Sequence, residues 1–274
     1  MSNQQMSYEE VSVLIEQQMA NIKYKIIVGS GKGGVGKSTI AVNLAWGLAM
    51  NGYAVGLLDA DINGPSLGKM LGIEDLSGPR QYIDNRINPI EKHGLKIISI
   101  SSFMKDPDEP IVWRGPAKGG VIRQFLSEVD WGELDYLIID LPPGTGDEAL
   151  TIGQSIPDAD GLVVVTTPQD VALLDSRKAI RFAGLLNLPV IGVVENMSGY
   201  KCPHCGENID LFKTGGGEKS AKDLKVDFLG AIPIDEKVVD STDQGFSYLF
   251  KYGKSEVGKK FLSVVNNITE KVGS

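Results

Sequence analysis

Short runs of apolar residues recur along the chain, and each run is nearly continuous rather than alternating with polar positions. Runs of this length and character predict strands that are buried on both faces. They occur at YKIIV (24–28), YAVGLLD (53–59), LKIISI (95–100), LDYLIID (134–140), GLVVVTT (161–167) and LPVIGVV (188–194). Strands of this kind are typical of parallel sheets covered by helices, so the pattern predicts such a sheet.

Helical patterns lie between several of these strands, at 38–52, 116–130 and 170–186. Strands and helices that alternate along a chain form a parallel sheet through right-handed crossovers. The predicted fold class is therefore α/β, with a doubly wound, mainly parallel sheet.

Two polar, turn-rich segments interrupt the alternation. Residues 74–93 are expected to form a surface excursion, and residues 196–217, which contain both cysteines, are expected to form a loop. No evident repeat, low-complexity tract or linker divides the sequence. We therefore expect one domain over 24–274, preceded by a helical extension over 1–23.

Amphipathic helices are predicted near both ends of the sequence. The first, over 7–22, gathers apolar residues on one side: Val11, Leu14, Ile15 and Met19. The second, over 255–272, does the same with Val257, Phe261, Val264, Val265 and Ile268. Packing of both apolar sides on the body of the protein is the expected arrangement. A partner-binding or mobile first helix and a membrane-targeting last helix are the alternatives.

Composition narrows the classes of partner. Of the 274 residues, 42% are hydrophobic and 23% are charged, as in an ordinary globular protein, and the net charge of −8 argues against a wholly basic nucleic-acid binder. Two cysteines are too few for a disulfide scaffold. Neither a signal-peptide pattern nor an apolar stretch of about 18 residues is present. We expect cytoplasmic localisation, reduced thiols, and neither membrane nor nucleic acid as a partner.

The segment GKGGVGKST (31–39) has the spacing of a phosphate-binding loop, G-x-x-x-x-G-K-[ST], between a predicted strand and a predicted helix. Its glycines allow backbone N–H groups to surround phosphate oxygens, and the helix N-terminus favours their negative charge. Lys37 is expected to neutralise the β- and γ-phosphates, and Ser38 to coordinate Mg²⁺. The predicted nucleotide-binding residues of this loop are Gly31, Lys32, Gly33, Gly34, Val35, Gly36, Lys37, Ser38 and Thr39.

Three further motifs follow in order: LLDADINGPS (57–66), LIIDLPPGTGD (137–147) and ENMSGYKCPHCG (195–206). A second lysine, Lys32, stands at the start of the phosphate loop. With these features the sequence resembles the deviant Walker A group, which includes nitrogenase iron protein and the MinD and ParA partition ATPases. Over roughly residues 24–250 it resembles the Mrp/ApbC iron–sulfur cluster carriers in particular, because partition ATPases need no cysteine pair.

The resemblance implies roles for the charged residues of these motifs. Lys32 would reach the nucleotide of the partner subunit, so that hydrolysis needs a face-to-face homodimer. Asp61 would position the attacking water. Asp59 would lie near Mg²⁺, and Asp140 would hold Mg²⁺ through water.

Two later stretches would serve the base of the nucleotide. By the same resemblance Asn196 would contact the adenine ring, and a turn-forming asparagine is the alternative. AIPID (231–235) resembles a loop that packs against the base. The predicted catalytic residues acting on Mg–ATP are thus Lys32, Lys37 and Asp61.

The segment CPHCG (202–206) holds both cysteines and one of the two histidines. A redox dithiol normally has its first Cys at a helix N-terminus, and ENIDLF after this motif gives no helix signal. A complete zinc ribbon would need a second cysteine knuckle. His204 as a metal ligand is a further alternative. Two chains that meet on a twofold axis would instead supply four thiolates, from Cys202 and Cys205 of each.

The expected function is that of a carrier which binds ATP, hydrolyses it slowly and holds a labile iron–sulfur cluster between two subunits. The expected cluster is 4Fe–4S, with zinc as the alternative, and the recipients would be apo iron–sulfur proteins. A MinD- or ParA-like partition or positioning ATPase acting on membrane or DNA is the alternative function. Liposome binding in the presence of ATP would favour that alternative, whereas an iron-dependent chromophore would favour the carrier.

Overall fold

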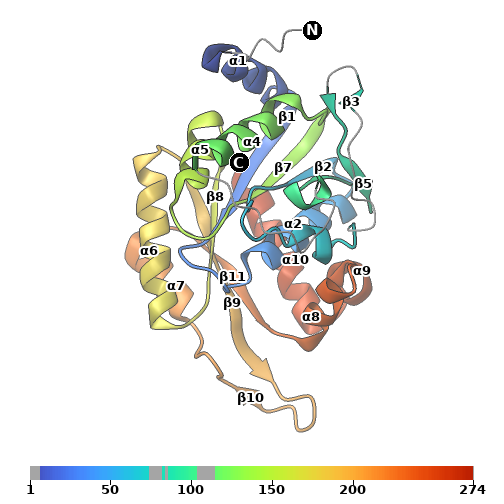
Figure 1. Cartoon of the computed structure of the whole chain (residues 1–274). Helices are drawn as coiled ribbons and strands as arrows, with labels where there is room; N and C mark the ends of the chain where they lie inside the picture. The colour runs from blue at the N-terminus through green and yellow to red at the C-terminus, as the bar shows by residue number, and fades with distance from the viewer. Residues whose placement is uncertain (1–6, 74–81, 84–85, 104–114, 274) are drawn as a thin grey trace.

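The computed structural model describes residues 7–73, 82–83, 86–103 and 115–273. Within these residues nine strands form one sheet with helices on both faces, which confirms the predicted fold class (Figure 1). The strands of this sheet are β1 (Ile22–Gly29), β2 (Val55–Asp59), β5 (Ile90–Lys92), β6 (Leu95–Ile98), β7 (Leu134–Asp140), β8 (Gly161–Thr166), β9 (Val190–Lys201), β10 (Asn208–Ile209) and β11 (Phe228–Ile234). A separate pair is formed by β3 (Tyr82–Ile83) and β4 (Arg86–Ile87).

The helices divide between the two faces of the sheet (Figure 1). One face is covered by α2 (Lys37–Met50), α3 (Leu67–Met70), α8 (Glu236–Asp243), α9 (Tyr248–Tyr252) and α10 (Glu256–Val272). The other is covered by α1 (Tyr8–Met19), α4 (Gly115–Glu128), α5 (Asp147–Ser155), α6 (Asp170–Leu185) and α7 (Gly216–Leu224).

The strand order places the phosphate loop at the middle of the sheet. The order is β10-β9-β8-β1-β7-β2-β6-β5, and β11 pairs with β9 as well. All of these pairs are parallel except β5 with β6 and β10 with β9. Strand β1 lies between β7 and β8. From β1 the chain continues to β2 on one side, and it later reaches β8 on the other side, so the direction of winding reverses at β1. The carboxyl ends of parallel strands around such a reversal are where open α/β sheets bind ligands.

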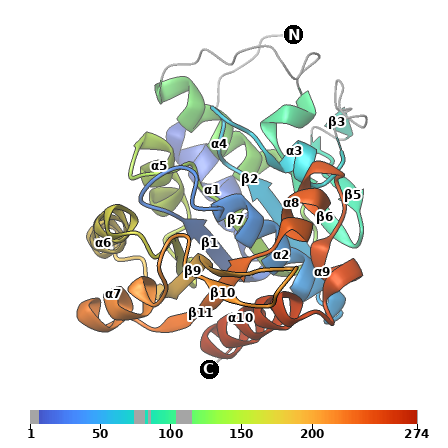
Figure 2. The ribbon, with the colours of Figure 1, turned by 90° about the horizontal axis from the view of Figure 1, so that it is seen from below.

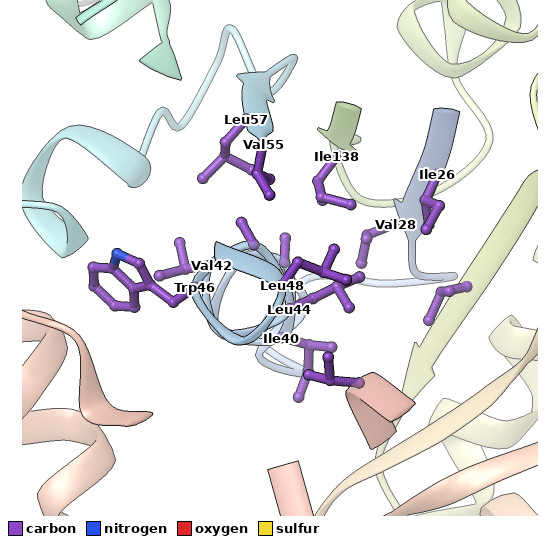
Figure 3. Close-up of a cluster of buried hydrophobic side chains, with 14 of the residues drawn as sticks. Ile26, Val28, Ile40, Val42, Leu44, Trp46, Leu48, Val55, Leu57 and Ile138 are labelled. Atoms are coloured by element: carbon purple, nitrogen blue, oxygen red, sulfur yellow. The ribbon is translucent and has the colours of Figure 1, made fainter. Parts of the chain in front are cut away.

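The core explains why the central strands are apolar throughout. Successive side chains of a strand point to opposite faces, so Ile26 and Val28 of β1 pack beneath α2 while Ile27 packs on the other side. Helix α2 is itself covered by strands on one side and by α9 and α10 on the other. Its apolar residues are therefore buried nearly all round, as Figure 3 shows beside β1, β2 and β7.

The first helix packs on the body of the protein, as expected. Ser7 and Glu10 form a capping box that begins α1, and Ile15 and Met19 are buried against α4 and the sheet. Val11 and Leu14 of the predicted apolar side are half-buried. Burial of this side supports the docked arrangement rather than a free helix.

The last helix is docked in the same way. In α10 the side chains of Phe261, Val264, Val265 and Ile268 are buried against α2 and β11. The apolar side that the membrane-targeting alternative requires is therefore covered by the protein itself. No helix within the described part of the chain is long and apolar enough to cross a membrane.

Several element boundaries differ from the sequence-based prediction. Strand β2 begins at Val55 rather than at 53, and β6 ends at Ile98, after which Ile100–Phe103 form a 3₁₀-helix. The segment 74–93, predicted as a surface excursion, contributes β5 as an antiparallel edge strand. Residues 74–81 and 84–85 of that segment lie outside the described residues.

The two segments predicted as loops in the last third of the chain contain strands. Residues 196–217, expected to be a loop, include the end of β9 and β10, which form an antiparallel hairpin. Residues 231–234 of AIPID belong to β11, which runs parallel to β9. The β9–β10 arm, residues 198–215, is called the cysteine hairpin below, and it extends beyond the helices at the lower end of Figure 1.

Candidate functional site

The phosphate loop connects β1 to α2, and its glycines are required by the path of the backbone. Gly34 and Gly36 have φ angles of +78° and +79°, a region that other residues rarely adopt. A Cβ atom at Gly36 would also collide with the side-chain amide of Asn196. At Gly31 a Cβ would collide with the backbone of Asp175 in α6. The glycines therefore permit both the curl of the loop and close contact with its neighbours.

A cavity of about 200 Å³ lies over this loop, at the carboxyl ends of the central strands. It is lined by Ser30, Lys32, Gly33, Gly34, Gly36, Lys37, Ser38, Thr39, Asp61, Ser66, Met70 and Pro143. The structure thus brings together the three residues predicted to be catalytic, Lys32, Lys37 and Asp61. Two loop residues predicted to bind nucleotide do not line this cavity: the side chain of Val35 is buried in the core, and Gly31 packs against α6.

Lys37, which lines this cavity, forms a buried ion pair with Asp140 at the end of β7. The Lys37 Nζ atom lies 2.6 Å from Asp140 Oδ1 and 3.2 Å from Ser38 Oγ. Asp140 is fully buried, and its Oδ2 atom has no hydrogen-bond partner among the described residues. A buried carboxylate oxygen without a donor is suited to accept a cation or a cation-bound water. The donor set at this point therefore fits Mg²⁺, which prefers carboxylate and hydroxyl oxygens.

Asp59 ends β2 directly beside Asp140, which ends β7. Its side chain is 1% exposed and accepts hydrogen bonds from Ser99 Oγ at 2.9 Å and from the Asp61 N–H at 3.1 Å. Burial, and next the negative charge of Asp140, raise the pKa of Asp59 to about 7. Burial also raises the pKa of Asp140, against the opposing charge of Lys37. Two crowded acids held in this way favour a bound cation.

Asp61 lies in the loop after β2, at the rim of the same cavity. Its Oδ1 atom accepts a hydrogen bond from the Gly64 N–H at 3.2 Å, which fixes the turn. Partial burial raises the pKa of Asp61, and the charge of Lys37 opposes that shift. Asp61 is thus a carboxylate held at the open side of the cavity, where a water molecule has access to it.

The raised pKa of Asp59 predicts how stability depends on pH in the metal- and nucleotide-free protein. An unfolded chain loses the Asp proton near pH 3.9, whereas the folded protein keeps it to about 7. Between these values the folded state binds the extra proton, so the free energy of unfolding falls as the pH rises from about 4 to about 7. Asp59→Asn should flatten this dependence and raise the free energy of unfolding at pH 8, as measured by urea titration. The exposed control Asp210→Asn should leave the dependence unchanged, and an unaltered slope in Asp59→Asn would contradict the assignment.

A second cavity, of about 230 Å³, adjoins the first and shares Gly36 and Thr39 with it. It is lined mostly by apolar residues: Met197, Phe212, Ile232, Pro233, Ile234, Val238, Val239 and Phe261, together with Asn196, Asp235 and Thr242. A mostly apolar cavity beside a phosphate loop suits a nucleotide base. We call this cavity the base pocket.

Asn196, the residue predicted to contact the adenine ring, lines the base pocket, and its side-chain amide is held by the phosphate loop. The Nδ2 atom donates a hydrogen bond to the Val35 carbonyl of the phosphate loop at 2.9 Å. Pro233 and Asp235 were not predicted as site residues, although AIPID pointed to this region. Their position depends on the pairing of β11 with β9, which the sequence does not reveal.

Lys32 stands where the phosphate cavity meets a more open hollow of about 520 Å³. The other residues of that hollow are Gln169, Asp170, Val171, Leu211, Phe212 and Lys213. The backbone carbonyl of Lys32 accepts a hydrogen bond from Ser30 Oγ at 2.9 Å, and Lys32 is half-buried. Lys32 therefore lies at the outer surface of the site, where a second molecule has access to it.

The cysteine pair lies outside both cavities, at the tip of the cysteine hairpin. Cys202 donates its N–H to the Glu207 carbonyl and accepts the Gly206 N–H at its own carbonyl, both at 2.9 Å. Backbone N–H groups of Cys205 and His204 lower the pKa of the Cys202 thiol. Cys205 is exposed and both thiols are free. Among the described residues no group of three His, Cys, Asp or Glu side chains could hold a metal ion, so the pair is an incomplete ligand set.

The chain matches the model of the ParA family that is described as NUBPL iron-transfer P-loop NTPase, over residues 21–269. It is 52% identical over 262 residues to the iron–sulfur cluster carrier protein of Methanocaldococcus jannaschii, covering 94% of this chain and 88% of that one. It is 49% identical over 265 residues to the protein of the same name from Methanococcus maripaludis, covering 96% and 90%.

Two solved structures are also similar to this chain. A nucleotide-binding protein of Archaeoglobus fulgidus, in complex with ADP, has a TM-score of 0.75 at 39% identity, covering 85% of this chain and 91% of that one. The cell division ATPase MinD of Pyrococcus furiosus has a TM-score of 0.64 at 20% identity, covering 90% and 99%, and shares the fold. Because the family model spans nearly the whole chain and the relatives match over most of their length, this protein belongs to the NUBPL iron-transfer P-loop NTPases of the ParA family.

Proposed function

We propose that this protein is an ATP-binding, slowly hydrolysing carrier that holds a labile iron–sulfur cluster and delivers it to apo iron–sulfur proteins in the cytoplasm. The observation that carries the proposal is the pair of free thiols at the tip of the cysteine hairpin, half-buried Cys202 and exposed Cys205. Strand β9, which leads into this hairpin, also lines the base pocket through Asn196. The relatives named iron–sulfur cluster carrier proteins support it.

The cluster is held between two subunits of a homodimer. Cys202 and Cys205 supply two thiolates, and an iron–sulfur cubane needs four. A twofold axis through the hairpin tips brings the second pair into place. The backbone N–H groups directed at Cys202 stabilise the negative charge that a cluster of thiolates gathers. A 4Fe–4S cluster is the proposed cargo, and zinc on the same four thiolates is the competing outcome.

In the nucleotide site each group has a distinct task. The loop from Gly31 to Thr39 surrounds the phosphates, and Lys37 neutralises their charge. Ser38, Asp59 and Asp140 would hold Mg²⁺, directly or through water, which supplies charge neutralisation at the phosphates.

Asn196 binds the adenine ring within the base pocket. The apolar walls at Pro233 and Val238 cover the faces of the ring. We infer that residues 24–274 work as one ATPase domain, and that residues 1–23 are an N-terminal extension whose helix α1 packs on it.

The function is tested by loading and transfer under anaerobic conditions. Protein reconstituted with iron and sulfide should acquire an iron-dependent visible absorption band. When it is mixed with an apoferredoxin, the holoferredoxin spectrum should appear at the expense of the band. Co-sedimentation with liposomes that depends on Mg–ATP, without any iron-dependent band, would instead support a partition or positioning ATPase.

Asp61→Asn should keep Mg–ATP bound and slow its hydrolysis roughly 100-fold, because the attacking water loses the carboxylate that orients it. Binding is measured by titration with a fluorescent ATP analogue, and turnover by phosphate release. Asp210→Asn, which removes a carboxylate from the exposed cysteine hairpin, is the matched control and should leave turnover unchanged. Parallel loss of binding and turnover in Asp61→Asn would assign Asp61 to nucleotide affinity instead.

Lys32→Ala should likewise slow hydrolysis more than it weakens binding, since the Lys32 side chain acts on the nucleotide of the partner. Because the proposed action is in trans, mixing Lys32→Ala with the Asp61→Asn variant should restore activity to one site of each mixed dimer. Absence of any recovery at every mixing ratio would place Lys32 in its own subunit's site.

A further inference from the structure

Glu195 is a fully buried carboxylate on β9, next to Asn196 and outside the nucleotide site described above. It accepts a hydrogen bond from the Gly215 N–H at 2.9 Å, and further hydrogen bonds from the Gly217 N–H and from the Ser198 hydroxyl. Burying a carboxylate is costly unless donors surround it. The donors come from two segments of the chain, at residue 198 and at residues 215–217, which Glu195 therefore holds together.

These contacts tie the two ends of the cysteine hairpin to each other. Ser198 begins the outgoing arm, Gly215 ends the returning arm, and Gly217 lies in the first turn of α7. A Cβ at Gly217 would collide with the Glu195 side chain, so the helix start sits directly against the carboxylate. The base of the hairpin is thus closed around one side chain.

The backbone between Glu195 and the hairpin is irregular. Asn196 pairs with Ile232 of β11, but the next paired residue on β9 is Tyr200, opposite Ile234. Four steps along β9 therefore match two steps along β11, which is a bulge in β9. Met197 within the bulge has a φ of +57°, which is uncommon for a residue with a side chain. A bulge redirects a strand, so the direction of the hairpin is set at residues 197–199.

The same bulge forms part of the base pocket. Met197 and Asn196 both line the pocket, on the opposite side of β9 from Glu195. Any adjustment of Met197 to an incoming base is made within this bulge, and the next residue of the bulge, Ser198, donates a hydrogen bond to Glu195. The base pocket and the hairpin direction therefore share one short stretch of backbone.

We propose that Glu195 is a positioning residue that makes the base pocket and the cysteine hairpin respond as one unit, so that nucleotide binding sets the position of Cys202 and Cys205. The inference rests on the proposed function, because the position of Cys202 and Cys205 affects cluster transfer only if these residues are the cluster ligands. Coupling of two sites requires a shared element that both of them bias. The bulge at 197–199, locked by Glu195, is that element.

The first test uses metal-free protein, so it does not depend on the cluster. Hydrogen exchange of the Gly215 and Gly217 amides should slow when the non-hydrolysable analogue Mg–AMPPNP binds. In Glu195→Gln one amide oxygen replaces two carboxylate oxygens, and at least one of these N–H groups then faces an NH₂ group. Their exchange should become about tenfold faster and should no longer respond to Mg–AMPPNP, although the variant still binds it.

The second test uses cluster-loaded protein. In the wild type, the rate of cluster transfer to apoferredoxin should differ with and without Mg–ATP, whereas in Glu195→Gln the two rates should become equal. Glu218→Gln removes an exposed charge from the first turn of α7 and is the matched control, with wild-type behaviour in both tests. Ser198→Ala, which removes the hydroxyl donor alone, should give a weaker effect in the same direction and serves if Glu195→Gln fails to fold.

The inference is overturned if the Gly215 and Gly217 amides of wild-type protein ignore Mg–AMPPNP, or if Glu195→Gln keeps the wild-type nucleotide response. A lower melting temperature with that response intact would show a purely structural role and would overturn it as well. Failure of cluster loading in the wild type would refute the proposed function, while the exchange experiment would still decide the role of Glu195.

Discussion

Replacing Cys202 with Ala should abolish iron–sulfur cluster binding and leave the affinity for Mg–ATP unchanged, and Cys205→Ala should do the same. Both thiols lie at the tip of the cysteine hairpin, outside the cavities over the phosphate loop. Each substitution removes one ligand from each subunit, so a bridged cluster would keep two of its four thiolates. The iron-dependent absorption band and iron content after anaerobic reconstitution measure the loss.

Stoichiometry separates the bridged cluster from other metal sites. Reconstituted wild-type protein should approach one cluster, about four irons, per two chains. Mössbauer spectroscopy and metal analysis would distinguish this cluster from a 2Fe–2S cluster or from zinc. The band and a dimeric mass should disappear together when the cluster is removed by a chelator, if the cluster bridges the subunits.

His204 provides the matched control for this experiment, because it lies between the two cysteines in the same turn. His204→Ala should retain the cluster, since the bridged arrangement uses only thiolates. Loss of the cluster in this variant would make the imidazole a ligand. A monomer that holds a complete cluster, or a double cysteine variant that keeps it, would refute the bridging arrangement.

The central strands could be predicted because their apolar runs reflect burial on both faces. The cysteine hairpin could not, because it extends beyond the helices and its residues after Asn196 are mostly exposed or half-buried. An exposed strand leaves no hydrophobic pattern to detect. In β11, Gly230 and Pro233 weaken the strand signal, although both are accommodated at the edge of the sheet.

Site residues could be predicted where they are close together in the sequence, and could not where strand pairing brings them together. The phosphate loop is a local structure whose spacing alone defines it, so its own residues could be singled out, whereas Ser66, Met70 and Pro143 of its cavity could not. The walls of the base pocket come from β9, β11 and α8, and their meeting depends on strand pairing. Glu195 escaped detection for a similar reason, because its partners Gly215 and Gly217 are brought to it by the return of the hairpin.

Lys37→Ala should weaken Mg–ATP binding about 100-fold, because a charged donor to the phosphates contributes on this order. Lys37 lines the phosphate cavity and is 6% exposed, so little solvent screens its charge. Within α2, Lys37 is the one lysine, and the other lysine that lines the cavity, Lys32, is half-buried where the cavity meets the more open hollow. Isothermal titration with Mg–ATP at fixed salt gives the change in affinity.

Lys37→Ala also removes the ion-pair partner of Asp140, so the control must separate the loss of affinity from a loss of stability. Asp140 would lose the ammonium group 2.6 Å away and remain buried, and an unpaired buried carboxylate destabilises the folded state. The double variant Lys37→Ala, Asp140→Asn removes that charge, so it should unfold at a higher temperature than Lys37→Ala and still bind Mg–ATP more weakly than the wild type. Lys259→Ala, an exposed lysine of α10, should keep wild-type affinity. If Lys37→Ala is folded by circular dichroism and binds Mg–ATP as tightly as the wild type, the phosphate loop is not the site of nucleotide binding.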